Sequence, residues 1–296
     1  MQPPELIPPT LFQLIPTKPL TTIKTLNFRG KLFSLESPVV MGILNITEDS
    51  FYEASRVNSV QSAIDKAGQM LTEGARILDI GAQSTRPGAS LLDENKETES
   101  LGNVVIELRK VFPEAILSVD TFYGSVARQA ILSGADMIND ISASTLDPKM
   151  IEVIAEFKVP YVLMHMQGQP SDMHHNPRYE HIVSEIILFL SRHINELSLR
   201  GIKDIVIDPG FGFGKNFEQN KILFQSLSAF HVLDRPLLVG ISRKKMIQHI
   251  ISAPTNESLN GTTAAHVIAL QRGANILRVH DVKAAKEAIQ IFLALG

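Results

Sequence analysis

Basic and hydroxyl side chains near the end of the chain form a pattern suited to binding an anion. Ser242, Arg243 and Lys244 are consecutive, and Arg278 and His280 are separated by one residue. Residues i and i+2 of a β-strand lie on one face, so Arg278 and His280 are expected to point the same way. Cationic side chains and the main-chain amides of a helix start bind phosphate groups. The pattern therefore favours a phosphate or diphosphate ligand.

A second set of polar residues offers hydrogen-bond acceptors. Asp120, Asn139 and Asp208 each end a short apolar run. An inward carboxylate without a cationic partner is costly unless a ligand supplies donors. A ring that carries adjacent N–H groups, such as an amino-pyrimidinone, matches a carboxylate through two parallel hydrogen bonds. These residues predict a ligand with such an edge, although they do not identify it.

The elements that must position these residues alternate regularly along the chain. Short apolar runs, predicted as strands, cover residues 39–47, 75–82, 115–122, 137–142, 161–166, 205–211, 237–242 and 276–281. Amphipathic stretches, predicted as helices, cover residues 59–73, 97–111, 123–133, 147–157, 178–199, 218–229, 262–272 and 282–295. Apolar strands joined by helices indicate a parallel sheet covered by helices. Eight such units predict an α/β fold of the closed (β/α)8 TIM barrel type, with a doubly wound open sheet as the alternative.

A barrel of this kind brings the polar strand ends together. All eight predicted strands end in polar residues, and the carboxyl ends of barrel strands form one face, where a pocket is expected. Before the barrel, residues 1–24 are rich in proline and predict an extended arm. Apolar residues around Arg29 and Gly30 predict a short hairpin over residues 26–33. We therefore expect an N-terminal arm followed by a single barrel domain over residues 25–296.

Composition excludes several classes of function. The 28 basic and 31 acidic residues nearly balance, which argues against nucleic acid or a membrane as partner. The absence of cysteine excludes a thiol nucleophile and cysteine-ligated zinc. No apolar window is long enough to cross a membrane and no export signal is evident, so a cytoplasmic location is expected.

Two local patterns imitate known motifs without matching them. Residues 210–215 (GFGFGK) lack the spacing of a phosphate-binding nucleotide loop, and Asn216 follows where such a loop needs Ser or Thr. His174 and His175 are adjacent in a loop-like stretch, an arrangement that rarely chelates one zinc ion. Neither a nucleotide loop nor a zinc site is predicted.

The ordered strand ends resemble those of the dihydropteroate synthase family across essentially the whole barrel. The matching motifs occupy residues 41–51 (MGILNITxDSF), 79–89 (DIGxxSTRPGA), 118–121 (SVDT), 138–143 (INDISA), 164–168 (MHMQG), 208–215 (DPGFGFGK), 240–244 (GxSRK) and 278–282 (RVHDV). The resemblance implies a barrel enzyme that transfers the dihydropterin-6-ylmethyl group from its diphosphate ester to 4-aminobenzoate, with the assistance of Mg2+. It also implies a homodimer, and sulfonamides as competitive inhibitors.

The resemblance assigns roles to individual residues. It places the pterin on Asp120, Asn139, Asp208 and Lys244. It places the diphosphate on Thr85, Arg278 and His280, and magnesium on Asn45. It surrounds the 4-aminobenzoate with Thr85, Arg86, Pro87, Phe213, Ser242 and Lys244. Asp49 and Phe51 belong to a first loop that is expected to be mobile.

The chain departs from the family pattern in its first two motifs. Glu48 stands where the family usually has proline, residues 52–55 replace a stretch that usually contains two glycines, and Gln83 replaces a glutamate. Two alternatives therefore stay open: a noncatalytic pterin-binding homologue and a pterin-dependent methyltransferase barrel.

Overall fold

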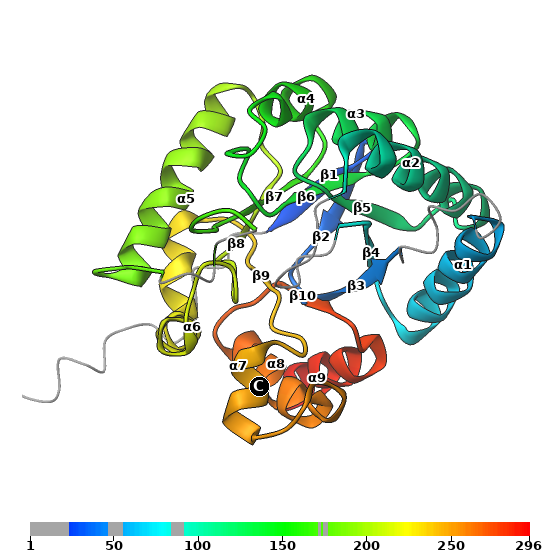
Figure 1. Cartoon of the computed structure of the whole chain (residues 1–296). Helices are drawn as coiled ribbons and strands as arrows, with labels where there is room; N and C mark the ends of the chain where they lie inside the picture. Colours follow the sequence, from blue (N-terminus) through cyan, green and yellow to red (C-terminus); the bar gives the residue numbers. More distant parts are fainter. Residues whose placement is uncertain (1–23, 47–55, 84–91, 171–172, 174–176) are drawn as a thin grey trace, which may run out of the picture.

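Eight of the described strands form one parallel sheet that closes on itself. The computed structural model describes residues 24–46, 56–83, 92–170, 173 and 177–296, with the main chain alone at 56–59. The strands of the large sheet are β3 (Val39–Asn45), β4 (Ile77–Gly81), β5 (Ile116–Asp120), β6 (Met137–Asp140), β7 (Tyr161–Met164), β8 (Ile205–Asp208), β9 (Leu238–Val239) and β10 (Ile276–Val279). Their order is β8-β7-β6-β5-β4-β3-β10-β9, and a bridge from Ile207 to Leu237 joins the two ends. The predicted (β/α)8 barrel is confirmed (Figure 1), and the open sheet is wrong.

Helices surround the barrel. They are α1 (Arg56–Glu73), α2 (Glu94–Val111), α3 (Gly124–Leu132), α4 (Lys149–Phe157), α5 (Ile182–Leu199), α6 (Phe217–Gln225), α7 (Lys245–Ile251), α8 (Leu259–Gln271) and α9 (Val282–Leu295). All eight predicted helices are present. The bounds of α9 are those predicted, the other seven differ at one or both ends, and the 3-10 helix Leu227–Leu233 follows α6. The sequence reading missed α7, because two turns rich in isoleucine show no clear helical period. No helix in the described parts of the chain is both long and apolar enough to span a membrane.

The inward side chains change from apolar to polar along most of the barrel strands. At the amino ends, Met41, Ile77, Ile116 and other buried residues form one cluster inside the barrel. Because side chains alternate along a strand, the residues two or four places further on share this inward face. Those places hold polar residues, including Asp79, Asp120, Asn139, Asp208 and Arg278. The barrel therefore has an apolar floor and a polar mouth.

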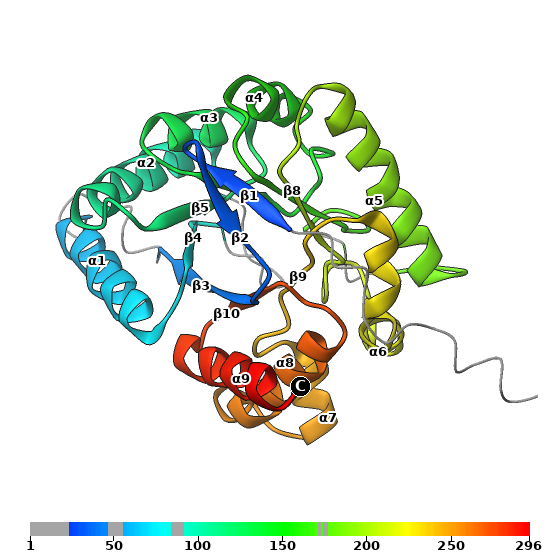
Figure 2. The ribbon, with the colours of Figure 1, turned by 180° about the vertical axis from the view of Figure 1, so that it is seen from behind.

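A hairpin closes the floor. Strand β1 (Thr25–Phe28) pairs with β2 (Lys31–Ser34), as predicted, and the positive φ angles of Arg29 and Gly30, 52° and 81°, give the tight turn that matches strand twist. Leu26, Phe28 and Leu35 are buried against the apolar cluster at the amino ends of the barrel strands. Figure 2 shows the two blue strands lying across this end of the barrel. The proline-rich arm predicted before the hairpin lies almost entirely outside the described residues.

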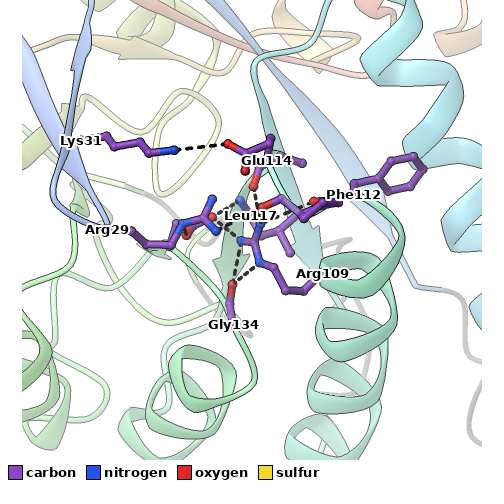
Figure 3. Close-up of polar contacts among 10 residues, drawn as sticks. Arg29, Lys31, Arg109, Phe112, Glu114, Leu117 and Gly134 are labelled. Atoms are coloured by element: carbon purple, nitrogen blue, oxygen red, sulfur yellow. Dashed lines mark hydrogen bonds and ion pairs between the residues drawn. The ribbon is translucent and has the colours of Figure 1, made fainter.

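A buried carboxylate fastens the hairpin to the barrel (Figure 3). Asp136, which precedes β6, contacts Arg29 Nε at 2.7 Å and Arg109 Nη2 at 2.5 Å, and it also accepts the main-chain N–H of Leu117 at 2.8 Å. The Arg109 guanidinium also donates to the carbonyl oxygens of Ala115 and Gly134. Two guanidinium groups thus offset the charge of Asp136, and a main-chain N–H adds a hydrogen bond to it. The floor is therefore held by polar contacts as well as by apolar packing.

Candidate active site

A fully buried carboxylate, Asp79, organises the middle of the barrel. Ser118 Oγ donates to its Oδ1 at 2.6 Å, while Asn139 Nδ2 and Arg278 Nε donate to its Oδ2 at 3.0 and 2.6 Å. Strands β4, β5, β6 and β10 each supply one of these four residues. A buried carboxylate is stable only when its oxygens accept hydrogen bonds or contact a cation, and these three donors meet that requirement. Asp79 therefore positions Asn139 and Arg278 from below.

Arg278 also pairs with Asp120. Its Nη2 lies 2.6 Å from Asp120 Oδ2. Burial raises the pKa of Asp120, and the guanidinium opposes that rise. The pKa of Arg278 is raised above its usual range by Asp79 and Asp120, although burial alone would lower it. Arg278 is thus held in place by two acidic partners, and these partners offset much of the charge it could offer to a bound anion.

Two connected hollows open at the polar mouth. The inner one, about 210 Å³, is lined by Asn45, Asp120, Phe213, Ser242, Lys244, Arg278, His280 and several neutral residues. The outer one, about 890 Å³, lies over the starts of α6 and α7 and shares Phe213, Ser242, Lys244 and His280 with it. None of the described residues that line the outer hollow is acidic, whereas Lys244, Lys245 and His249 are basic or titratable. The inner hollow thus has both acidic and basic side chains in its lining, whereas the basic lining of the outer hollow suits an anionic group.

Lys244 stands between the two hollows. Its Nζ donates to the Phe211 carbonyl oxygen at 2.6 Å and lies 4.2 Å from the centre of the Phe213 ring. Burial lowers the pKa of Lys244 to about 8, and the nearby carboxylate of Asp208 opposes that fall. The ammonium group is therefore mostly charged at neutral pH and loses its charge as the pH rises through 8.

Asp208 lies buried at the end of β8. The main-chain N–H of Gly210 donates to Oδ1 at 2.7 Å. Burial raises the pKa of Asp208, while that N–H and the cations Lys244 and Arg278 oppose the rise. None of the described residues donates a hydrogen bond to Oδ2, which lies near Gly240 at the edge of the inner hollow. One oxygen of Asp208 thus holds the loop, and the other is free to receive a ligand donor.

His280 and Arg243 offer less positive charge to a bound anion than the sequence suggested. Ser242 Oγ is 3.1 Å from His280 Nδ1 and accepts the main-chain N–H of His280 at 3.2 Å. Burial and the neighbouring cations lower the pKa of His280 to about 4, so the ring is neutral at pH 7. Arg243 lines the outer hollow, but its guanidinium binds both carboxylate oxygens of Asp281, at 2.8 and 2.6 Å. Within the two terminal motifs, Lys244 and Arg278 are the cations that line the inner hollow, and Lys244 and the paired Arg243 line the outer one.

Lys215 supports the mouth from beneath. Its buried Nζ donates to the carbonyl oxygens of Gly210 and Phe213 at 2.8 and 2.9 Å and approaches His165 Nδ1 at 3.1 Å. Burial lowers the pKa of Lys215 to about 7. At Gly210, where φ is +74°, a Cβ atom would lie 1.9 Å from the His165 carbonyl oxygen, so only glycine fits. The ammonium group serves the main chain here, which agrees with the rejection of a nucleotide loop.

Comparisons with known proteins agree with this geometry. A model of the pterin binding enzyme family matches residues 41–280. Dihydropteroate synthase of Haemophilus influenzae is 40% identical over 90% of this chain and 96% of its own length. The chain belongs to the dihydropteroate synthase family of pterin-binding enzymes. The resemblance read from the sequence motifs is confirmed.

Solved structures of this family have the same fold. Yersinia pestis dihydropteroate synthase in a sulfonamide drug complex has a TM-score of 0.84 and 41% identity, covering 91% of this chain and 98% of that one. Xanthomonas albilineans dihydropteroate synthase with 4-aminobenzoic acid has a TM-score of 0.85 and 38% identity, covering 93% and 98%. The dihydropteroate synthase fold is therefore shared along nearly the whole barrel.

The structure gathers most of the residues that resemblance to this family singled out. Asn45, Asp120, Phe213, Ser242, Lys244, Arg278 and His280 line the inner hollow. Asn139 and Asp208 are buried among the same strand ends, next to residues of that lining. Five others, Asp49, Phe51, Thr85, Arg86 and Pro87, lie outside the described residues.

Three residues important to the site received no role from the sequence. Asp79 holds Arg278, Lys215 holds the loop after β8, and Gln83 lines the inner hollow. The sequence did contain a signal for Asp79, because a carboxylate within the apolar strand β4 needs a buried hydrogen-bonding or cationic partner. Asp140 is different: Ser142, Ser144 and the Tyr161 hydroxyl all donate to it, so it locks the turn after β6.

Proposed function

We propose that this protein joins (7,8-dihydropterin-6-yl)methyl diphosphate to 4-aminobenzoate, which yields 7,8-dihydropteroate and diphosphate. The observation that carries the proposal is a pair of hollows that share Lys244 and Phe213. One offers acceptors for a pterin, and the other has no acidic side chain among the described residues that line it. The related Xanthomonas enzyme has been solved with 4-aminobenzoic acid and the Yersinia enzyme with a sulfonamide. Both substrates, and sulfonamides as competitive inhibitors, therefore fit this chain.

In this proposal the pterin binds between Asp120, Asn139, Asp208 and Lys244. Asp208 Oδ2 accepts from the ring edge, where adjacent N–H groups match a carboxylate. Asn139 already donates to Asp79, which fixes its amide in one orientation. Because these residues lie deep in the barrel, the proposal has the pterin ring bind inside and the methyl diphosphate nearer the opening.

The diphosphate binds to Arg278 and His280, joined by Thr85 from outside the described residues. Arg278 presents a guanidinium held by two carboxylates, and the neutral ring of His280 is a hydrogen-bond donor. Since Asp79, Asp120 and Asp208 offset the charges of Arg278 and Lys244, bare diphosphate would meet little net positive charge here.

Mg2+ would supply the missing charge, and the donor set fits this use. Among the described residues, no group of three or more His, Cys, Asp or Glu side chains is arranged to hold a metal. Mg2+ bound through substrate phosphates needs only one or two protein oxygens, and Asn45 offers its amide oxygen from the lining of the inner hollow. When bound, Mg2+ neutralises charge that develops on the leaving diphosphate.

The 4-aminobenzoate binds where Phe213, Ser242 and the Lys244 stem meet, with its carboxylate toward the outer hollow. The Phe213 ring, 9% exposed, and the aliphatic part of Lys244 give an apolar surface for the benzene ring. The family resemblance also assigns Thr85, Arg86 and Pro87 to this subsite and Asp49 and Phe51 to the first loop, and all five lie outside the described residues.

The reaction proceeds by departure of diphosphate and attack of the amine. The C–O bond of the pterin methylene breaks, and its electron pair leaves with the diphosphate oxygen. Arg278 stabilises that oxygen, while Asp120 and Asp208 stabilise the electron-poor pterin methylene. The amine nitrogen then forms the C–N bond and gives up one proton, and no general base is required because the amine is uncharged at pH 7.

Omission of each component in turn tests this function. We expect dihydropteroate and diphosphate to form only when the purified protein is mixed with dihydropterin-methyl diphosphate, 4-aminobenzoate and Mg2+ together. Binding of the pterin diphosphate without turnover would instead support a noncatalytic pterin-binding protein. Methyl transfer from a methylated pterin, with no condensation, would support the methyltransferase alternative.

We further propose a cytoplasmic homodimer. Apolar side chains are exposed on the neighbouring helices α7, α8 and α9, among them Ile250, Ile268 and Ile291. Burial of such side chains between two subunits would remove them from water. Light scattering after size-exclusion chromatography is expected to give twice the chain mass, and a monomer at assay concentration would refute the dimer.

A further inference from the structure

The turn after β6 has a backbone conformation that residues with a side chain rarely adopt. Ala143 and Ser144 are consecutive, and their φ angles are +53° and +62°. In this left-handed region the Cβ atom crowds the main chain, so two such residues in a row persist only where other contacts hold them. The turn directly follows Asn139 and Asp140, which end β6 at the mouth of the barrel.

Asp140 holds this turn through both of its carboxylate oxygens. It is fully buried. Its Oδ1 accepts the main-chain N–H and the hydroxyl of Ser142, both at 2.7 Å. Its Oδ2 accepts the main-chain N–H of Ser144 at 2.6 Å and the hydroxyl of Tyr161 at 2.7 Å. Burial raises the pKa of Asp140, and these hydrogen bonds oppose that rise. Because Tyr161 begins β7, the carboxylate connects the turn to the next strand.

Asp140 and Tyr161 lie behind the sheet, outside the two hollows. Side chains alternate along β6, so Asn139 faces the inside of the barrel and Asp140 faces the helices. Tyr161 is buried in the apolar cluster between the strands and the helices. Neither Asp140 nor Tyr161 lines the inner or the outer hollow. A ligand in these hollows would not touch them, so they act on it through the residues that they position.

Ile141 is the residue through which the turn reaches the inner hollow. Its buried side chain lines that hollow and belongs to one apolar cluster with Phe122 and Phe213. Ile141 lies between Asp140 and Ser142, which are hydrogen-bonded to each other. The direction of its side chain therefore depends on the hold that Asp140 has on the turn.

We propose that Asp140 and Tyr161 are positioning residues for the pterin: they hold the turn after β6 so that Ile141 keeps one wall of the inner hollow in place. This inference rests on the proposed function, in which the inner hollow takes the pterin ring. An apolar wall contacts the ring equally in the bound substrate and in the transition state. Loss of the hold should therefore weaken pterin binding without slowing the chemical step.

Substitution of Tyr161 by phenylalanine removes one hydrogen bond and leaves the charge of Asp140 unchanged. We expect the Kd for dihydropterin-methyl diphosphate, measured by calorimetry with Mg2+ and without 4-aminobenzoate, to rise about 5-fold, with kcat within about 2-fold of wild type. Asp140→Asn should raise this Kd further. Whichever way its amide lies, the nitrogen faces a main-chain N–H of the turn, which cannot accept a hydrogen bond.

Arg29→Met is the matched control at the opposite end of the barrel. It also removes one donor from a buried carboxylate, because Arg29 Nε lies 2.7 Å from Asp136 Oδ1. It should leave the Kd for the pterin diphosphate unchanged. If Tyr161→Phe acted through stability alone, the two variants would both lose thermal stability and would bind the pterin diphosphate alike.

Substitution of Ala143 by glycine tests whether the hold acts through the backbone. Glycine adopts a φ of +53° without strain, so the turn then needs the Tyr161 contact less. Combined with Ala143→Gly, Tyr161→Phe should raise the Kd only about 2-fold relative to Ala143→Gly alone. Packing of the Tyr161 ring cannot produce this rescue, because phenylalanine retains the ring.

The outcomes separate this inference from the proposed function. If Tyr161→Phe binds the pterin diphosphate as wild type or Arg29→Met does, or if Ala143→Gly gives no rescue, the positioning role is wrong and the function stands. If wild type binds the pterin diphosphate but forms no dihydropteroate, the function fails and calorimetry still decides the positioning role. A wild type that does not bind the pterin diphosphate overturns both.

Discussion

Substitution of Arg278 by methionine is expected to reduce catalysis strongly and to destabilise the fold. The guanidinium is the common partner of Asp79 and Asp120, at 2.6 Å from each, and Asp79 is fully buried. Removal of one partner from a buried ion pair costs about 3–5 kcal/mol of unfolding free energy, and loss of charge stabilisation at the leaving group reduces kcat/KM by about 10^3-fold. Chemical denaturation and steady-state kinetics measure the two effects.

The destabilisation should depend on pH in a defined direction. Without the guanidinium, burial and repulsion from Asp79 raise the folded-state pKa of Asp120 further above its unfolded value. The variant should therefore regain stability as the pH falls through that raised value. Arg128→Met is the matched control, since the Arg128–Glu156 pair is bidentate but exposed, and surface pairs contribute about 0–1 kcal/mol. Equal losses in the two variants would contradict the central role of Arg278.

Substitution of Asp208 by asparagine is expected to reduce kcat/KM for dihydropterin-methyl diphosphate on the order of 10^3-fold, with the fold retained. The asparagine Oδ1 still accepts the Gly210 N–H that Asp208 accepts at 2.7 Å. Its Nδ2, however, is a donor in the place of Oδ2 and faces the N–H groups of the pterin. Calorimetric titration and steady-state kinetics measure the loss.

Asp204→Asn provides the comparison for Asp208 at the opposite end of the same strand. Asp204 directly precedes β8 and its Oδ1 accepts the main-chain N–H of Asn27 at 3.1 Å, far along the strand from the mouth. Its asparagine variant should bind pterin within about 2-fold of wild type. A pterin affinity for Asp208→Asn that matched this control would remove Asp208 from the pterin subsite.

The sequence was sufficient to predict the barrel because each strand and each crossover leaves its own local pattern. Apolar runs gave all eight barrel strands, and Arg29-Gly30 gave the hairpin. The strand ends also predicted which residues converge, since topology alone brings Asn45, Asp120, Lys244 and Arg278 to one face. The substrates and the roles of individual residues came from the match to family motifs, because hydrophobic periodicity carries no information about them.

Pairing between distant side chains was beyond the sequence. Nothing local shows that Arg278 pairs with Asp79 and Asp120, 199 and 158 residues away, or that Arg243 turns toward Asp281. The shifted pKa values of Lys244 and His280 depend on burial, which appears only once the barrel has closed. The sequence can predict that a charged side chain lies near a site, but the partner of that side chain in the fold decides whether its charge is available to a ligand.

The hairpin at the floor has a practical consequence for attaching this enzyme to other objects. Because β1 and β2 cover the end of the barrel opposite the mouth, the chain enters the fold at Lys24 on the side remote from the substrates. A surface anchor or a fluorescent reporter joined ahead of the hairpin would therefore leave the mouth facing the solution. Tethering at that end gives an immobilised catalyst whose substrates arrive unobstructed.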